Sequence, residues 1–123
     1  MKNDRQPYEY AYYYTQYKGL YDRILTVLKT WDIWSISAYD GIMSVYEGEV
    51  VALLKHLQQT HNAEEVYSLL TTIFAEVDPS FDYAQKTAEL HRMAQEIWFY
   101  WNQYLEAKDA PPSARARALL LQF

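Results

Sequence analysis

The three histidines are the side chains best suited to binding a metal or transferring protons, and their spacing favours neither role. His56 and His61 are five residues apart, which on one helix puts them about 140° apart around the axis. His91 is remote from both, and the chain has no His-Glu-x-x-His or Glu-x-x-His motif. We therefore expect no metal site and no cofactor.

Nucleophilic and phosphate-transfer chemistry also lack the residues they need. There is no cysteine and no serine in a Gly-x-Ser-x-Gly turn, and three scattered glycines cannot form a phosphate-binding loop. The best catalytic alternative is a carboxylate pair, Asp32 with Asp40 or Glu47. Trp31 and Trp34 lie close to it in sequence, and carboxylates lined by aromatic rings are typical of sugar-cleaving sites. Because small helical domains rarely carry such a site, we expect a protein that is not an enzyme.

Charge is distributed unevenly along the 123 residues, whose net charge is −5. Residues 1–29 carry five basic and three acidic side chains, and residues 86–123 carry five basic and four acidic ones. Residues 30–85 carry nine acids against the single base Lys55, a net charge of −8. This acidic block predicts attraction to a basic partner and repulsion of nucleic acid, although a solvated acidic face is the simpler interpretation.

Composition predicts one soluble helical domain. Half of the residues are hydrophobic, which is enough for a core, and the few glycines and prolines argue against a fold of many strands. The absence of cysteine suits a reducing cytoplasm. The N-terminus lacks a signal-peptide core, and no run of about eighteen apolar residues is present, so we expect no contact with a membrane.

Seven tyrosines lie within residues 8–21, a density typical of surfaces that contact other molecules. Apolar residues recur there at steps of three and four, which predicts one helix over about 8–30 in which Gly19 marks a close approach or slight bend. Its inward stripe comprises Tyr10, Tyr14, Tyr17, Tyr21, Ile24, Leu28 and Trp31. Tyr8, Tyr12 and Tyr13 lie off this stripe and are candidates for contact with a partner or a second copy.

Three further helices and a short C-terminal one complete the predicted fold, an all-α, single-domain antiparallel bundle of four to five helices over residues 1–123. Capping signals place their starts at Ser44, Asn62, Asp78-Pro79 and Ser113, and their ends near 59, 77, 108 and 121. The segment 31–43 is either extended or folded as a connector. The expected inward residues are Tyr46, Val50, Leu53, Leu54 and Leu57, then Val66, Leu69, Leu70, Ile73, Phe74 and Val77, then Leu90, Met93, Ala94, Ile97, Trp101, Tyr104 and Leu105.

The span from Trp31-Asp32 to Val77 resembles a group of small, uncharacterised bacterial helical proteins. The matching residues are Trp31, Asp32, Asp40, Tyr46, Glu47, Glu49, Val51, Leu54, Glu64 and Glu65, and Ile33-Trp34 departs from that pattern. This resemblance implies no enzymatic role. In size, acidity and lack of cysteine, the chain is also similar to immunity proteins, which neutralise a cognate bacterial toxin, often a basic nuclease. Phage-encoded inhibitors of host defence nucleases have the same profile.

The sequence thus predicts an inhibitor that binds a basic protein partner, such as a toxin or nuclease, and does not itself bind nucleic acid. Acidic side chains are expected to attract that partner and aromatic ones to anchor the contact. The acidic candidates are Asp32, Asp40, Glu47, Glu49, Glu64 and Glu65, and the aromatic ones are Tyr12, Trp34, Tyr39 and Trp98. The alternative is a structural or regulatory module that self-associates, as a homodimer, through its aromatic residues.

Overall fold

The computed structural model describes residues 7–36 and 45–109, and this part of the chain contains five α-helices and no strand. The all-α class predicted from the sequence is confirmed. The α-helices are α1 (Pro7–Gln16), α2 (Leu20–Trp31), α3 (Glu47–His56), α4 (Ala63–Val77) and α5 (Thr87–Asp109), and short 3₁₀ helices η3 (Leu57–Gln59) and η4 (Tyr83–Lys86) follow α3 and precede α5. The predicted helix near 113–121 lies outside the described residues.

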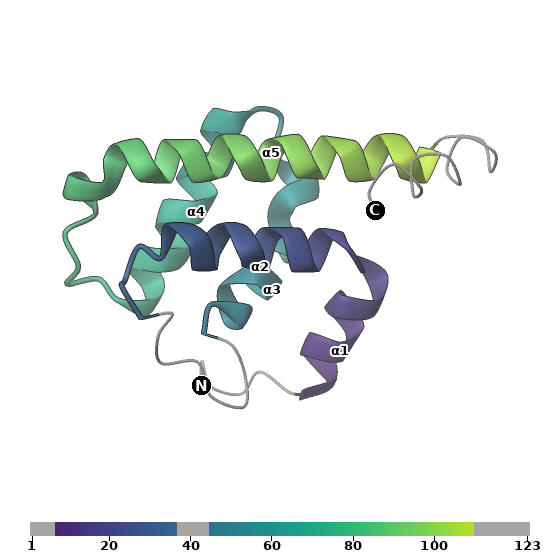
Figure 1. The fold of residues 1–123 in the computed structure, drawn as a ribbon, viewed down its shortest axis with the longest axis horizontal. Coiled ribbons are helices and arrows are strands. Elements are labelled where there is room, and N and C mark those ends of the chain that lie inside the picture. Colours follow the sequence, from purple (N-terminus) through teal and green to yellow (C-terminus); the bar gives the residue numbers. More distant parts are fainter. Residues whose placement is uncertain (1–6, 37–44, 110–123) are drawn as a thin grey trace.

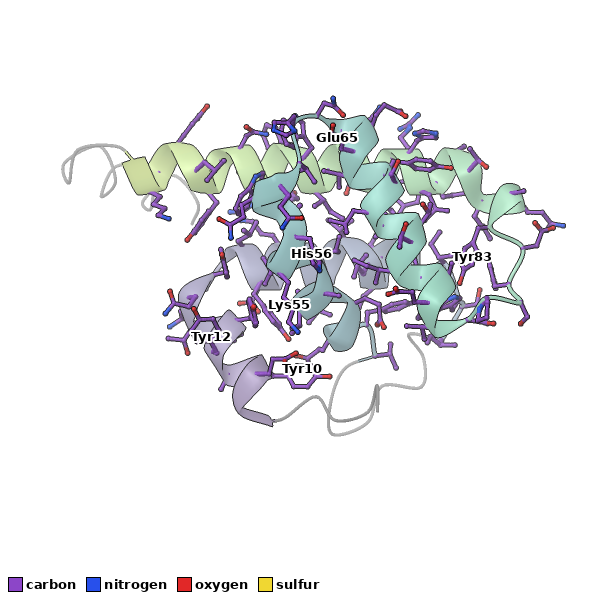
Figure 2. The ribbon with its side chains drawn as sticks, turned by 180° about the vertical axis from the view of Figure 1, so that it is seen from behind. Tyr10, Tyr12, Lys55, His56, Glu65 and Tyr83 are labelled. Atoms are coloured by element: carbon purple, nitrogen blue, oxygen red, sulfur yellow. The ribbon has the colours of Figure 1, made fainter. Side chains whose placement is uncertain are left out.

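The helices form two packed layers. Helices α2 and α5 run antiparallel side by side, while α3 and α4 lie behind them in Figure 1 and in front of them in Figure 2. Helix α1 packs against α3 at one end. The two layers enclose one core, to which α2, α3, α4 and α5 each contribute a buried apolar stripe.

Most of the residues predicted to face inward do so. Val50, Leu54, Leu70, Phe74 and Ile97 are at most 1% exposed, and the other predicted positions in α3 and α5 are buried or packed against the core. Two predictions were wrong. Val77 is 58% exposed because it lies in the last turn of α4, beyond the end of the core, and Tyr14 is 40% exposed because α1 leaves the axis of α2.

Gly19 separates the single helix predicted over 8–30 into α1 and α2. Its φ of 88° lies in a region that side-chain-bearing residues rarely adopt, so the backbone can turn here at little cost. The hydrogen bonds Tyr21 N to Tyr17 O (2.7 Å) and Arg23 N to Gly19 O (3.0 Å) span the turn. In Figure 1, α1 turns away from the line of α2, so the break changes the direction of the chain by more than the slight bend expected from the sequence.

The start of α3 also differs from its prediction. The helix begins at Glu47, and the residue at its N-cap is Tyr46, with a φ of 77° and no side-chain capping bond. Ser44, the predicted cap, lies outside the described residues. A positive φ is costly for a bulky residue, so other contacts must hold Tyr46 in place.

The start of α4 agrees with its capping signal. The side chain of Asn62 accepts a hydrogen bond from the backbone N–H of Glu65 at 2.8 Å. Glu65 in turn accepts from the backbone N–H of His61 at 2.8 Å, one residue before the partner expected in a capping box.

The predicted start of the fourth helix at Asp78-Pro79 was wrong. Asp78 ends α4, and its Oδ1 accepts hydrogen bonds from the N–H (3.1 Å) and hydroxyl (2.7 Å) of Ser80. Asp82 then caps η4 by accepting from the N–H of Ala84 at 3.2 Å, and α5 begins only at Thr87. Aspartate before proline stabilises a turn here, because its carboxylate accepts a hydrogen bond from the backbone that follows.

Candidate protein-binding surface

Asp32, a predicted partner-binding residue, is committed to hydrogen bonds within the fold. It ends α2 in the left-handed conformation, with a φ of 47°. Its Oδ1 accepts hydrogen bonds from the Tyr46 hydroxyl at 2.6 Å and from the backbone N–H of Ile36 at 2.9 Å. The same hydroxyl accepts from the N–H of Trp34 at 3.2 Å. Asp32 thus organises the chain that leaves α2.

Glu47 is held in a similar way. Its Oε1 accepts a hydrogen bond from the hydroxyl of Tyr21 at 2.6 Å, which joins α3 to α2. The ring of Tyr21 is 1% exposed. Burial, followed by the hydrogen bond to Glu47, raises the pKa of Tyr21 well above its ordinary value. Burial, followed by the bond to Asp32, likewise raises the pKa of Tyr46.

Trp34, a predicted aromatic anchor, is half-buried and packs against the core. Its indole N–H donates to the hydroxyl of Tyr83 at 3.1 Å, and its ring stacks on Tyr46 with centroids 5.6 Å apart. The ring also makes an edge-to-face pair with Phe74, with centroids 4.7 Å apart. These contacts connect the segment after α2 to the end of α4, so Trp34 has a structural role.

The remaining aromatic candidates divide between core and surface. Trp98 is half-buried and packs against the core. Tyr12 is 55% exposed on α1, where its ring makes an edge contact with Tyr13 at 5.0 Å. Tyr39 and Asp40 lie outside the described residues. Among the described candidates, Tyr12 therefore presents the most aromatic surface to solvent.

Glu64 and Glu65 lie exposed in the first turn of α4, and Glu49 is half-buried in the first turn of α3. Glu64 contacts the Nδ1 of His91 at 3.3 Å, and Glu65 contacts the Nδ1 of His61 at 3.0 Å. The backbone N–H of His61, and then its ring, lower the pKa of the Glu65 carboxyl. Both glutamates are exposed and face outward, as a surface that attracts cations requires.

Glu65 also lies at a groove between α3 and α4, with a volume of about 420 Å³. The α4 side of the groove carries Glu65, Leu69, Thr72 and Glu76, at steps of four, three and four residues. Helix α3 contributes His56, and Figure 2 shows His56 and Glu65 on the face formed by these two helices. The described lining contains no lysine or arginine.

The sequence prediction missed Glu76 and His56 as site residues. The sequence did contain a signal for Glu76. Residues 65, 69, 72 and 76 form one stripe along a helix, next to the stripe that is buried. No sequence pattern indicates which face of α3 meets that stripe, so His56 could not be found in this way.

Two kinds of feature are absent from the described part of the molecule. Its His, Asp and Glu side chains form no group of three that could hold a metal ion. None of its helices combines the length and apolar character needed to cross a bilayer.

Comparisons with protein-family models, curated proteins and solved structures found no significant match. The resemblance to immunity proteins therefore stays a prediction.

Proposed function

We propose that this protein is a non-enzymatic inhibitor that binds a basic protein, as an immunity protein binds a cognate bacterial toxin such as a nuclease. The observation that carries the proposal is the α3–α4 groove, which carries two carboxylates, those of Glu65 and Glu76, and no described lysine or arginine. A groove of this kind favours basic side chains of a partner.

The charged residues around the groove also favour a basic partner. The described residues 45–85 include seven carboxylates and one lysine, Lys55. Lys55 contacts the Oε1 of Glu9 at 2.9 Å, so its charge is balanced within the fold. The α3–α4 layer therefore carries excess negative charge, which accelerates encounter with a basic partner at low salt.

The positions of the other carboxylates support binding over catalysis. Asp32 and Glu47, the carboxylates best placed in sequence for acid–base work, accept hydrogen bonds from Tyr46 and Tyr21. Through these hydrogen bonds, the two carboxylates take part in the packing of α2 against α3. Tyr12, exposed on α1 beside α3, supplies an aromatic anchor at the edge of the acidic layer.

The test is to co-express the chain with the product of the neighbouring gene and to measure their affinity by titration calorimetry. We expect a stoichiometric complex that weakens with salt, and rescue of cells in which the partner alone stops growth. The double change Glu65→Gln and Glu76→Gln should weaken binding by about tenfold or more, the scale for losing charged contacts.

Glu106→Gln is the matched control, because Glu106 is an exposed carboxylate on α5 that does not line the groove. It should leave the affinity unchanged. A neighbouring product that neither binds nor harms cells would contradict the proposal, and so would equal effects of the groove and control changes.

Self-association is the second candidate function, supported by exposed aromatic rings. Tyr12 on α1 is 55% exposed and Phe99 on α5 is 57% exposed. Size-exclusion chromatography with light scattering separates the two functions. A homodimer that dissociates after Tyr12→Ser supports self-association, and a monomer at micromolar concentration excludes it.

A further inference from the structure

The α3–α4 groove carries its two carboxylates at a defined separation, with apolar surface between them. Glu65 and Glu76 are exposed on α4, on the face that Figure 2 shows. Because eleven residues are close to three full turns of a helix, the two side chains project from the same side of α4, about 16 Å apart. Leu69 lies between them on the same stripe and is half-buried, as is Ala52 on the α3 side of the groove. The groove thus presents two separate negative charges joined by a short apolar strip.

The polar side chains of the groove are not used to hold the fold together. Within residues 7–36 and 45–109, the side chains of Gln59, Thr72 and Glu76 make no hydrogen bond or ion pair. The contacts of Glu65 with His61 involve Oε1 alone, so Oε2 has no partner in this part of the chain. A ligand can therefore pair with both carboxylates without breaking a contact between helices.

The walls of the groove favour an occupant that is itself helical. Both walls are helices, α3 and α4, and the backbone N–H and C=O groups in the middle of a helix are paired within it. An extended peptide would find no backbone partner on this surface, and its own amides would lie unpaired over Leu69. A helix pairs its amides internally and lays one apolar stripe, flanked by polar side chains, on the surface that it covers.

We infer that the α3–α4 groove binds an amphipathic helix of the basic partner, with its apolar stripe on Ala52 and Leu69 and two cations, eleven residues apart, paired with Glu65 and Glu76. The inference rests on the proposed function, since it takes the partner to be basic, and it adds the conformation of the bound segment and the spacing of its charges. A helix with its cations at another spacing can pair with only one carboxylate at a time, so the spacing selects among basic helices.

The test uses the full chain and three synthetic peptides of eighteen residues, titrated by calorimetry at low salt. The first has two arginines eleven residues apart, with leucines four and seven residues after the first arginine, so that all four lie on one helical face. The second has its arginines five residues apart, the spacing that would match the two carboxylates if the peptide were extended. The third has the order of the first, with proline in place of a central alanine on the opposite face, which breaks the helix. We expect the first peptide to bind at least about fivefold more tightly than the other two, because each of these loses a charged contact or the helical conformation.

Variants of the protein assign the two charges. Glu65→Gln and Glu76→Gln should each lower the affinity for the first peptide by about threefold to tenfold and remove the preference for the eleven-residue spacing. Glu106→Gln, which changes an exposed carboxylate outside the groove, should do neither. In spectra of the unmodified protein, the methyl signals of Leu69 should shift on titration, whereas the indole N–H of Trp31, which lines a different groove between α2 and α5, should not.

Three outcomes would overturn the inference: no binding of the first peptide, equal binding of the first peptide and either of the others, or binding that leaves the Leu69 signals unshifted. The neighbouring gene product tests the proposed function separately. A complex with that product, together with failure of the first peptide, would reject the helical segment and retain the inhibitor. Selective binding of the first peptide without such a complex would reject the proposed function and retain the preference of the groove.

Discussion

The hydroxyl of Tyr46 donates a hydrogen bond of 2.6 Å to Oδ1 of Asp32, and this bond joins two residues that both have positive φ. Asp32 ends α2 and Tyr46 precedes α3, so the bond holds together the two ends of the connection between these helices. Each conformation is costly for a side-chain-bearing residue, and the shared hydrogen bond offsets part of that cost.

Tyr46→Phe should therefore destabilise the protein by about 1–3 kcal/mol. The change leaves Oδ1 of Asp32 and the N–H of Trp34 without the hydroxyl that bonds both of them. Urea denaturation followed by far-UV circular dichroism measures the loss. Tyr12→Phe removes a hydroxyl from an exposed ring and should change the free energy of unfolding by less than about 0.5 kcal/mol. Equal effects of the two changes would contradict the role assigned to Tyr46.

Stability should fall at alkaline pH because the pKa values of Tyr21 and Tyr46 are raised in the folded state. Below about pH 10, the ordinary value, both states hold the phenolic protons and the stabilisation is fully present. Above it, the unfolded chain loses these protons first, so the free energy of unfolding decreases as pH rises towards the folded-state pKa. Urea denaturation between pH 8 and 11.5 should show this decrease.

Tyr21→Phe provides the control for the alkaline loss. It removes one of the groups with a raised pKa, so the free energy of unfolding should decline less steeply above pH 10 than in the unmodified protein. Parallel declines in the two proteins would show that lysines or exposed tyrosines dominate the effect.

Asn62→Ala should cost about 0.5–2 kcal/mol. The change removes the side-chain oxygen that accepts from the N–H of Glu65 at the start of α4. Ser68→Ala, an exposed position inside the same helix, is expected to be neutral or slightly stabilising because alanine has the higher helix propensity. Thermal melts of the two variants make the comparison, and an Asn62→Ala protein that melts with the parent would refute the cap.

Gly19→Ala should destabilise the protein by about 1–2 kcal/mol even though no atom lies within 4 Å of the added Cβ. The cost arises from the φ of 88°, and not from crowding. D-Alanine at the same position, introduced by chemical ligation, prefers positive φ and should be tolerated. An L-alanine variant as stable as the parent would mean that the chain can adopt the continuous helix over 8–30.

The sequence predicted best those features that depend on neighbours along the chain. The stripe of Val66, Leu70, Ile73 and Phe74 and the cap at Asn62 follow from periodicity and local hydrogen bonding, and both are confirmed. The break at Gly19 could not be predicted, since one glycine inside an amphipathic pattern costs only about 1 kcal/mol and is compatible with a continuous helix.

The candidate site was harder to predict because carboxylates were assigned by their position in an acidic block. The hydrogen bonds that hold Asp32 and Glu47 within the fold join residues 14 and 26 positions apart. Such pairs depend on how helices pack, and a single sequence gives no information about them. Glu64 and Glu65 were placed correctly on the surface, because the first turn of an amphipathic helix exposes its polar face.

Helix α1 packs less extensively against the rest of the fold than the other helices do. None of its described side chains is fully buried, and its contacts are mainly with α3, where Lys55 meets Glu9. A segment attached this lightly can detach while the rest of the fold stays intact. Amide protons of α1 should therefore exchange with solvent much faster than those of α4 and α5, and limited proteolysis within residues 7–36 and 45–109 should cut first near Gly19. We therefore expect the tyrosine-rich helix α1 to open separately from the other helices and to present new aromatic surface without global unfolding.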